Sequence, residues 1–427
     1  MRIEHWSDQN KSDQYSILNS QFSSAGFVQF QNFPIISRMN RREFLYSTAI
    51  LAGAPLPVAS KYDLVIKGGR VLDASQRLDR VMDVAVRGGK IAALQTSIAT
   101  SDAAEVFEAR GRIVTPGLID IHAHPRPGEL SPAQVLSAGV TTVVDGGSRG
   151  ADGIQDMIDV ASKAPNRVRV LINVSRLGNQ PEGELLKFET ADAEAGRAAV
   201  RKHRDIIVGV KARLSRPLAG EHDLDGVRRA HEITRTFGIP VMIHIGDTRS
   251  PLPDILALLR PGDIVTHVYA PPPNGIMDAN GRVLPQVREA RRRGILFDIG
   301  NGRNGHITWE VADRAFQQDF LPDTISSDLN GAGLTDQVFD FPNVLSKFLM
   351  LGMPLDQVIA RGTVNSAKAI PALKDLGTLR TGAVADIAVL ELAQGDFEFV
   401  DNIAGKRTGR QKLIARAAFV AGKRWTL

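Results

Sequence analysis

Two histidines separated by one residue, His122 and His124, lie at the end of an apolar, strand-like run over 113–121. Residues i and i+2 of a strand project from the same face, about 7 Å apart along the chain, so both imidazoles could bind one metal ion. A His-x-His pair also occurs by chance in a chain of this length. Four further residues of ligand type follow at the ends of later apolar runs, and together the set favours a hydrolytic site with two metal ions.

Lys211 ends one of these runs, over 206–211. Taken alone, a lysine at a strand end usually extends its amine to solvent. Beside two cations an ammonium group would be repelled, whereas a neutral amine could react with CO2 to give a carbamate whose oxygens bridge the ions. A buried lysine with a lowered pKa could supply that neutral amine.

Single histidines, His244 and His267, lie at the ends of the next two apolar runs, and Asp328 follows the last one. Either histidine alone would more often be a core residue that bonds to the backbone. An aspartate in such a place is usually a helix cap or a turn residue. The order along the chain favours a common site, because the candidate ligands fall on predicted strands one, four, five, six and eight.

Composition narrows the chemistry. The chain has 427 residues, 43% of them hydrophobic, which is enough for one large barrel and an accessory domain. Its 52 Lys and Arg against 47 Asp and Glu are spread along the sequence, so nothing supports nucleic-acid binding. Because there is no cysteine, any metal must be held by nitrogen and oxygen ligands.

The first sixty residues differ from the rest. Residues 1–38 are rich in Ser, Gln and Asn without a clear period, and we expect them to be a disordered extension or an over-long gene prediction. The segment 39–60 resembles a twin-arginine export signal, which predicts a periplasmic or otherwise exported protein; a frayed helix in a cytoplasmic protein is the alternative. The apolar part is short and contains Pro55 and Pro57, so no stable membrane anchor is expected.

Between 113 and 376, apolar strands alternate with helical segments, which is typical of a parallel sheet with crossover helices. Eight strands suit a (β/α)8 TIM barrel, whose active site lies at the carboxyl ends of its strands. The strands are predicted over 113–121, 141–145, 168–174, 206–211, 241–245, 264–268, 295–299 and 324–327. Short strands with glycine turns over 61–112 and 377–427 predict a small β-sandwich built from both ends of the chain.

Three motifs make the chain similar to the amidohydrolase superfamily, of the binuclear type with a carboxylated lysine: Pro116-Gly117-Leu118-Ile119-Asp120-Ile121-His122-Ala123-His124, Gly139-Val140-Thr141-Thr142-Val143-Val144-Asp145 and Gly382-Ala383-Val384-Ala385-Asp386-Ile387. The resemblance covers roughly 61–427. It implies that His122 and His124 hold one metal and that His244 and His267 hold the other. Lys211, carboxylated by CO2, would then bridge the ions, and Asp328 would join the first metal.

The resemblance also implies a mechanism. Two divalent ions, with zinc favoured over manganese or iron, would make a bridging water acidic enough to act as hydroxide and would polarise an amide or ester carbonyl. Asp328 would be both a ligand and the catalytic group that carries the proton to the leaving group. Asp120, on the same strand face as His122, would support the ligands rather than bind metal.

Within the superfamily, the stretches 145–148, 208–215 and 320–328 look most like the deacetylase-like branch, which is related to dihydroorotases. The segment 124–128 resembles a dihydroorotase segment in which an arginine binds a substrate carboxylate, so Arg126 is a candidate for that role. An exposed loop position is equally compatible with the sequence. Arg176, after the third predicted strand, is a second candidate, because arginine offers a bidentate fork.

Asn301 departs from the pattern, since the branch would be expected to carry a histidine there.

The preferred function is hydrolysis of an amide or ester bond in a small acetylated substrate that carries a carboxylate. Cyclic-amide hydrolysis of the dihydroorotase or hydantoinase type is the alternative, followed by a non-catalytic scaffold. The only partner predicted is a small-molecule substrate, and the sequence leaves a homo-oligomer open.

Overall fold

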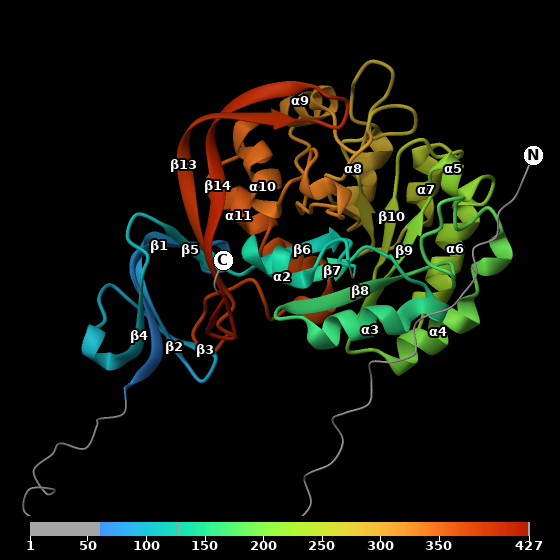
Figure 1. The fold of residues 1–427 in the computed structure, drawn as a ribbon. Coiled ribbons are helices and arrows are strands. Elements are labelled where there is room, and N and C mark those ends of the chain that lie inside the picture. The colour runs from blue at the N-terminus through green and yellow to red at the C-terminus, as the bar shows by residue number, and fades with distance from the viewer. Residues whose placement is uncertain (1–59, 127, 426–427) are drawn as a thin grey trace, which may run out of the picture. The chain divides into compact units, whose positions relative to one another are not determined.

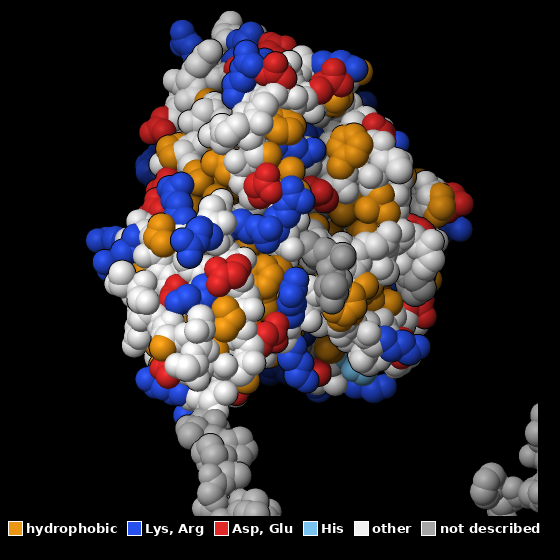
Figure 2. Space-filling model, turned by 60° about the vertical axis from the view of Figure 1, so that its left-hand side comes forward, with side chains coloured by type: hydrophobic (Ala, Val, Ile, Leu, Met, Phe, Trp, Pro, Cys, Tyr) orange, Lys and Arg blue, Asp and Glu red, His pale blue; other side chains and the backbone are white. Residues whose placement is uncertain are grey.

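The computed structural model describes residues 60–126 and 128–425. The extension predicted over 1–38 lies outside these residues, as does the export signal predicted over 39–60 except for Ser60, so both stay predictions. No helix of the described part is long and apolar enough to cross a membrane. On the face that Figure 2 displays, basic and acidic side chains are interspersed rather than segregated.

Seven parallel strands form a curled sheet in sequential order, with helices outside it (Figure 1). The strands are β6 (Leu118–Ala123), β7 (Val140–Asp145), β8 (Arg167–Asn173), β9 (Ile207–Arg213), β10 (Val241–His244), β11 (Ile264–Thr266) and β12 (Leu296–Phe297). This confirms the predicted fold class, a TIM-barrel-like domain with a β domain from both chain ends. Their burial on both faces explains why they appear in the sequence as continuous apolar runs.

The eighth predicted strand, 324–327, is not a regular strand among the described residues. Isolated bridges, Asp298 with Thr324 and Ala123 with Leu329, close the ring instead. The hydroxyls of this segment explain the irregularity: Thr324 and Ser326 donate to Asp298, so side-chain bonds take part in holding the segment.

The α-helices of the described residues surround the barrel strands. They are α2 (Pro132–Ser137), α3 (Ile154–Lys163), α4 (Ala193–Lys202), α5 (Arg216–Ala219), α6 (Asp223–Thr234), α7 (Leu252–Leu258), α8 (Pro285–Arg292), α9 (Trp309–Gln317), α10 (Phe341–Met350), α11 (Leu355–Arg361) and α12 (Val364–Ala369). α4 illustrates how the sequence forms these helices, with a capped start and one buried face. The Asp192 side chain caps it by accepting from Ala195 N, and its buried residues, which include Gly196, Ala199 and Val200, share one face.

The small domain is one eight-stranded sheet, built from both chain ends. Its strands are β1 (Tyr62–Asp73), β2 (Leu78–Arg87), β3 (Lys90–Gln95), β4 (Ala103–Glu108), β5 (Ile113–Pro116), β13 (Ile387–Val400), β14 (Lys406–Val420) and β15 (Lys423–Trp425). Most pairings are antiparallel, while β1 pairs in parallel with β4 and β5. Buried residues lie on both faces of β1, with Leu64 and Val65 in different clusters.

The run 113–121, predicted as one strand, is two strands of different sheets. β5 pairs with β13 in the small sheet, whereas β6 begins the barrel. Pro116 has no N–H for a ladder, and a Cβ at Gly117 would meet Thr141 Oγ1 at 2.0 Å. The chain therefore changes sheets at this Pro-Gly pair, an exchange that an unbroken apolar pattern hides.

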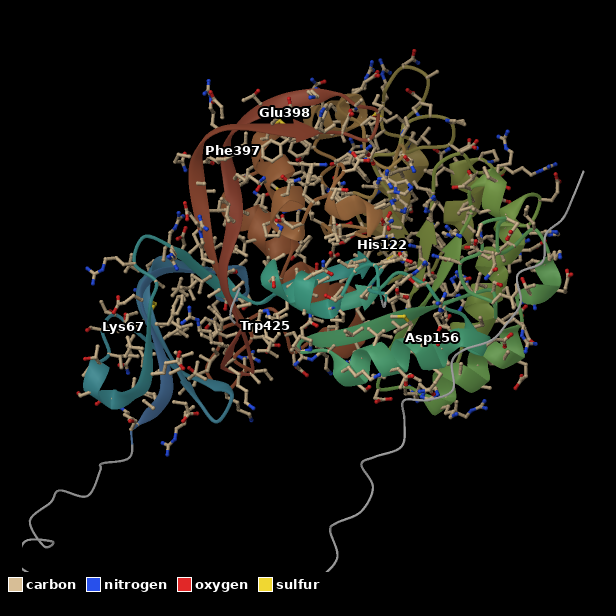
Figure 3. The ribbon with its side chains drawn as sticks, viewed as in Figure 1. Lys67, His122, Asp156, Phe397, Glu398 and Trp425 are labelled. Atoms are coloured by element: carbon tan, nitrogen blue, oxygen red, sulfur yellow. The ribbon has the colours of Figure 1, made fainter. Side chains whose placement is uncertain are left out.

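The β13–β14 hairpin is longer than the short strands predicted over 377–427, since β13 has 14 residues and β14 has 15. β14 packs on α10 of the barrel domain, where Leu413 N donates to Ser346 Oγ at 2.8 Å. Figure 3 labels Phe397 and Glu398 on β13, well away from Trp425 of β15, the strand that pairs with the end of β14. The hairpin thus reaches from the small sheet to elements of the barrel domain.

Candidate metal centre

The six predicted ligands line one cavity of about 800 Å³. His122 and Lys211 lie within β6 and β9, and the others lie at or just beyond the carboxyl ends of their segments. Parallel strands end at the same side of a barrel, which is why residues separated by up to 206 positions converge there. His122, labelled in Figure 3, and His267 are the most deeply buried of the described histidines, each 1% exposed.

The first group of donors comprises His122, His124 and Asp328. Asp328 Oδ1 lies 3.0 Å from His124 Nε2 and 3.4 Å from His122 Nε2. Burial alone would raise the pKa of Asp328, but the adjacent His122 and His124 hold it well below its ordinary value. An ionised carboxylate facing two ring nitrogens is a set of hard and borderline donors that suits a divalent ion.

Lys211 lies beside this group, with Nζ 2.7 Å from His122 Nε2. The side chain is 1% exposed, and burial lowers its pKa to about 8. A large fraction of the amine is therefore neutral near pH 8, and the structure removes the usual solvent-facing interpretation of a strand-end lysine.

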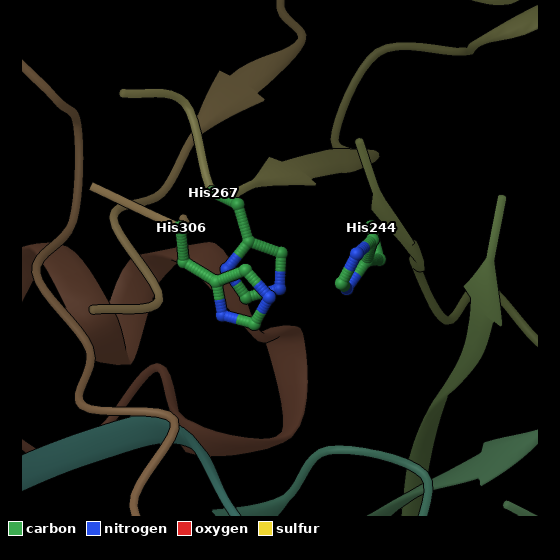
Figure 4. Close-up of side chains that lie close together, drawn as sticks. All are labelled: His244, His267 and His306. Atoms are coloured by element: carbon green, nitrogen blue, oxygen red, sulfur yellow. The ribbon is translucent and has the colours of Figure 1, made fainter. Parts of the chain in front are cut away.

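The second group contains a residue that sequence reasoning missed. His244, His267 and His306 line the cavity close together (Figure 4), with ligand nitrogens within 4.8 Å of one another. His306 lies in the loop after β12, five positions beyond Asn301, where the pattern had led us to expect a histidine. The signal available in the sequence was that this histidine follows the seventh predicted strand.

The imidazoles are in the form that metal binding requires. Burial lowers the pKa of His122, His244 and His267 well below the ordinary value, so these rings are neutral at physiological pH. The Nδ1 atoms of three rings are engaged elsewhere: His124 with Ser148 Oγ at 2.9 Å and His267 with Gly300 O at 2.7 Å, while His122 contacts Thr266. The Nε2 atoms of His122 and His124 lie instead among the other candidate ligands, 2.7 Å from Lys211 Nζ and 3.0 Å from Asp328 Oδ1. In known histidine metal sites, too, one ring nitrogen is held by a partner while the other binds the ion.

Thr266 links His122 to Asp298 through two successive hydrogen bonds. Thr266 Oγ1 donates to Asp298 Oδ2 at 2.7 Å and lies 3.1 Å from His122 Nδ1. Because the hydroxyl proton goes to Asp298, Thr266 accepts from His122 Nδ1–H, which fixes the tautomer with a free Nε2.

We expect Thr266→Val to reduce metal affinity by about 10–100-fold, because His122 loses the partner that orients it. Thr324→Val is the matched control, since Thr324 also donates to Asp298 but has no contact with His122. Metal content after dialysis against a graded series of chelator concentrations measures the effect. Equal losses in the two variants would contradict a specific role for the His122 contact.

Asp120 bonds to the two segments that carry His122 and Asp328. It accepts from His122 N at 3.2 Å and from Ser327 N at 3.1 Å, and the Ser327 hydroxyl also donates to it. Asp120 thereby ties the strand of His122 to the segment before Asp328. Burial raises its pKa to about 7.

The backbone around the ligands is tight. His267 and Asp328 have φ of 67° and 49°, conformations that non-glycine residues seldom adopt and that cluster at functional sites. A Cβ on Gly302 would lie 2.2 Å from His306 Nδ1 and 2.3 Å from Asp328 Oδ2. The absence of a side chain at 302 therefore allows His306 and Asp328 to approach each other.

The two arginines proposed as carboxylate anchors have different surroundings. Arg126 lines the cavity, its Nε has no hydrogen-bond partner among the described residues, and its nearest acid, Glu129, is 3.8 Å from Nη1. Arg176 is not among the cavity-lining residues. Its guanidinium binds Asp152 at 2.8 Å and Asp192 at 3.2 Å, so the structure does not bring Arg176 into the site.

Two further arginines were missed by the sequence analysis and line the cavity. Arg213 forms a bidentate pair with Glu184, with both bonds at 2.6 Å, and Arg303 pairs with Asp336 at 3.0 Å. Because acids already neutralise both of these cations, Arg126 is the arginine of the cavity wall with the weakest acidic partner.

Comparison with known proteins shows that the chain is similar to amidohydrolases in sequence and in structure. The sequence model of the family described as the amidohydrolase family matches residues 113–424. A protein named deacetylase from Enterococcus faecalis is 28% identical over 379 residues, covering 85% of this chain and 98% of the relative. The crystal structure of an adenine deaminase gives a TM-score of 0.80 at 28% identity, covering 86% of this chain and 100% of that chain. The crystal structure of a dihydroorotase gives a TM-score of 0.77 at 25% identity, covering 85% of this chain and 97% of that chain.

Proposed function

The chain belongs to the amidohydrolase family, whose matched region spans residues 113–424, and from this premise we propose that it deacetylates a small, carboxylate-bearing substrate. The bond cleaved is the amide or ester bond of an acetyl group. That the chain is a hydrolase follows from the family. The acetyl preference is supported by the relative named deacetylase, which matches over nearly its whole length.

The observation that carries the proposal is the convergence of the donors on one cavity that also exposes Arg126. The residues fit divalent cations, because three imidazoles kept neutral by burial, an ionised carboxylate and a buried lysine with a lowered pKa line one cavity. His122, His124 and Asp328 would hold one ion, and His244 and His267 the other. Lys211 would bridge them as its carbamate, and zinc suits this nitrogen and oxygen set.

When bound, the cations supply Lewis-acid chemistry, which polarises the acetyl carbonyl and makes water more acidic. Asp328 accepts the proton of the water that attacks the carbonyl carbon, since its carboxylate is ionised and faces the cavity. Asp328 then donates that proton to the leaving nitrogen or oxygen as the C–N or C–O bond breaks, and acetate is released.

Arg126 would bind the substrate carboxylate at the cavity wall. Its buried Nε lacks a partner among the described residues, and a buried guanidinium donor left unpaired is costly. A ligand carboxylate would satisfy it with a charge-assisted bond. Arg176 is excluded from this role by its position outside the cavity lining.

A hydrolysis screen with metal analysis tests the proposal. The substrates are N-acetyl and O-acetyl acids in both enantiomers, together with dihydroorotate, hydantoins and adenine. We expect about two metal ions per chain and activity on acetylated acids. Activity restricted to the cyclic amides or to adenine would replace the deacetylase assignment, and a chain without metal would favour the scaffold alternative.

A further inference from the structure

The loop after β12 brings His306 into the cavity although the expected position, Asn301, turns away from it. The Asn301 side chain accepts from Lys347 Nζ at 2.9 Å, and Lys347, which is fully buried on α10, also donates to Gln337 O at 2.7 Å. Residue 301 is thus used to anchor the loop. The ring that enters the site comes from the far end of the same loop.

The position of His306 suits a metal ligand. Its ring centroid lies 3.8 Å from that of His267 and 5.0 Å from that of His244 (Figure 4). Two nitrogens on one zinc ion are roughly 3.3–4.2 Å apart, given Zn–N bonds of about 2.0–2.1 Å. The ligand nitrogens of the three rings all lie within 4.8 Å of one another, which is close to this spacing.

The His306 Nδ1 atom is buried and forms no regular hydrogen bond with the described residues. It lies 3.0 Å from Asp328 Oδ2, a contact that helps to hold the pKa of that carboxyl low. The ring of His306 thus lies between the first group of donors and the rings of His244 and His267. A ring nitrogen placed among these donors is available to a cation.

One amide side chain holds this loop at both ends. Asn402 Oδ1 accepts from His306 N and Ile307 N, both at 2.9 Å. Asn402 Nδ2 donates to Gly302 O at 3.1 Å and to Gln337 Oε1 at 2.9 Å. Both polar atoms of the amide are used. They hold Gly302 at the start of the turn and His306 and Ile307 at its end.

Asn402 belongs to the turn of the β13–β14 hairpin, which is itself docked on α9. Neighbouring Asp401 accepts from Trp309 N at 3.0 Å, and Trp309 Nε1 donates to Gly405 O at 2.8 Å. Arg407 adds a bidentate pair with Asp313 at 2.7 and 2.6 Å. The hairpin that begins in the small β domain therefore ends at the loop of the metal centre.

We propose that His306 is a third imidazole ligand of the cation held by His244 and His267, and that Asn402 is the residue that positions it. This inference rests on the proposed metal centre. It assigns the loop over Gly300–Ile307 to that centre, and it assigns the C-terminal hairpin a role in metal binding as well as in packing.

The test uses the full chain, stripped by chelator and reloaded with Co²⁺, whose visible absorption reports the number and type of its ligands. Stepwise Co²⁺ titration gives the affinity of each site, and Zn²⁺ content after dialysis gives a second readout. The variants are His306→Ala, His306→Gln and Asn402→Ala, with Asn402→Asp as the conservative change that keeps the acceptor for His306 N. Asn166→Ala is the matched control, because this buried asparagine bonds Val140 O at the opposite end of the strands. Circular dichroism establishes that each variant is folded.

We expect wild type and Asn166→Ala to bind two ions. In both His306 variants one of the two affinities should fall by about 100-fold, with a change in the Co²⁺ spectrum, while the other stays unchanged. Asn402→Ala should weaken the same site by about 10–100-fold, as loss of a supporting partner does, and Asn402→Asp by less. Two unaltered affinities and spectra in the folded His306 variants would overturn the inference and leave the proposed function intact. A wild-type chain without metal would overturn both.

Discussion

Asp328→Asn is expected to lower kcat by about 10²–10⁴-fold, the range usual for removing a general acid–base group. Asn keeps an oxygen in nearly the same place but cannot accept the proton of the attacking water. Because its amide oxygen still faces His124, much of the metal should remain bound, and KM should change little. Steady-state kinetics on the best substrate of the screen, with metal content measured on the same samples, provide the check.

Asp156→Asn is the control for this variant. Asp156 lies on α3, exposed and paired with Arg149 at 2.9 Å, and it is well separated from His122 in Figure 3. Its kinetics should match wild type. If Asp328→Asn kept most of its kcat, Asp328 would not be the proton carrier, and the mechanism would need another group.

Lys211→Ala should have the second large effect, a loss of roughly 10³-fold or more in activity together with loss of bound metal. This would exceed the 10–100-fold cost of losing a supporting partner, because the variant lacks the side chain that we propose as the bridge between the two ions. A small carboxylate such as propionate should restore part of the activity, since it offers two oxygens in the space left by the side chain. Lys163→Ala, at the exposed end of α3, is the control. Retention of both ions in Lys211→Ala would exclude the bridging role.

The pH dependence of reloading tests the carbamate. Only the neutral amine reacts with CO2, and burial lowers the pKa of Lys211 to about 8 from 10.5. In metal-free protein, reloading with zinc at a constant concentration of dissolved CO2 should therefore accelerate as pH rises toward 8 and level off above it. An exposed lysine would continue to respond up to pH 10–11. Reloading that needs no bicarbonate in CO2-free buffer would argue against carboxylation.

The fold and the convergence of the six candidate donors on one cavity could be predicted because both depend on local pattern. Each barrel strand is an apolar run that ends in a polar residue, and parallel strands bring such ends to one side. His122 and His124 share a strand face for the same reason. Neither conclusion needs knowledge of which distant side chains meet, only the periodicity of each element and the direction of the sheet.

Which loop side chains reach the cavity is decided by the tertiary structure and could not be predicted from the sequence. His306 enters the site because Asn402, 96 positions away, bonds its backbone, and Arg176 leaves it because Asp152 and Asp192 bind its guanidinium. The change of sheets at Gly117 likewise depends on Thr141. Strand periodicity is a short-range property that the amino-acid order displays directly, whereas loop geometry is set by hydrogen bonds between distant residues, which have no spacing rule.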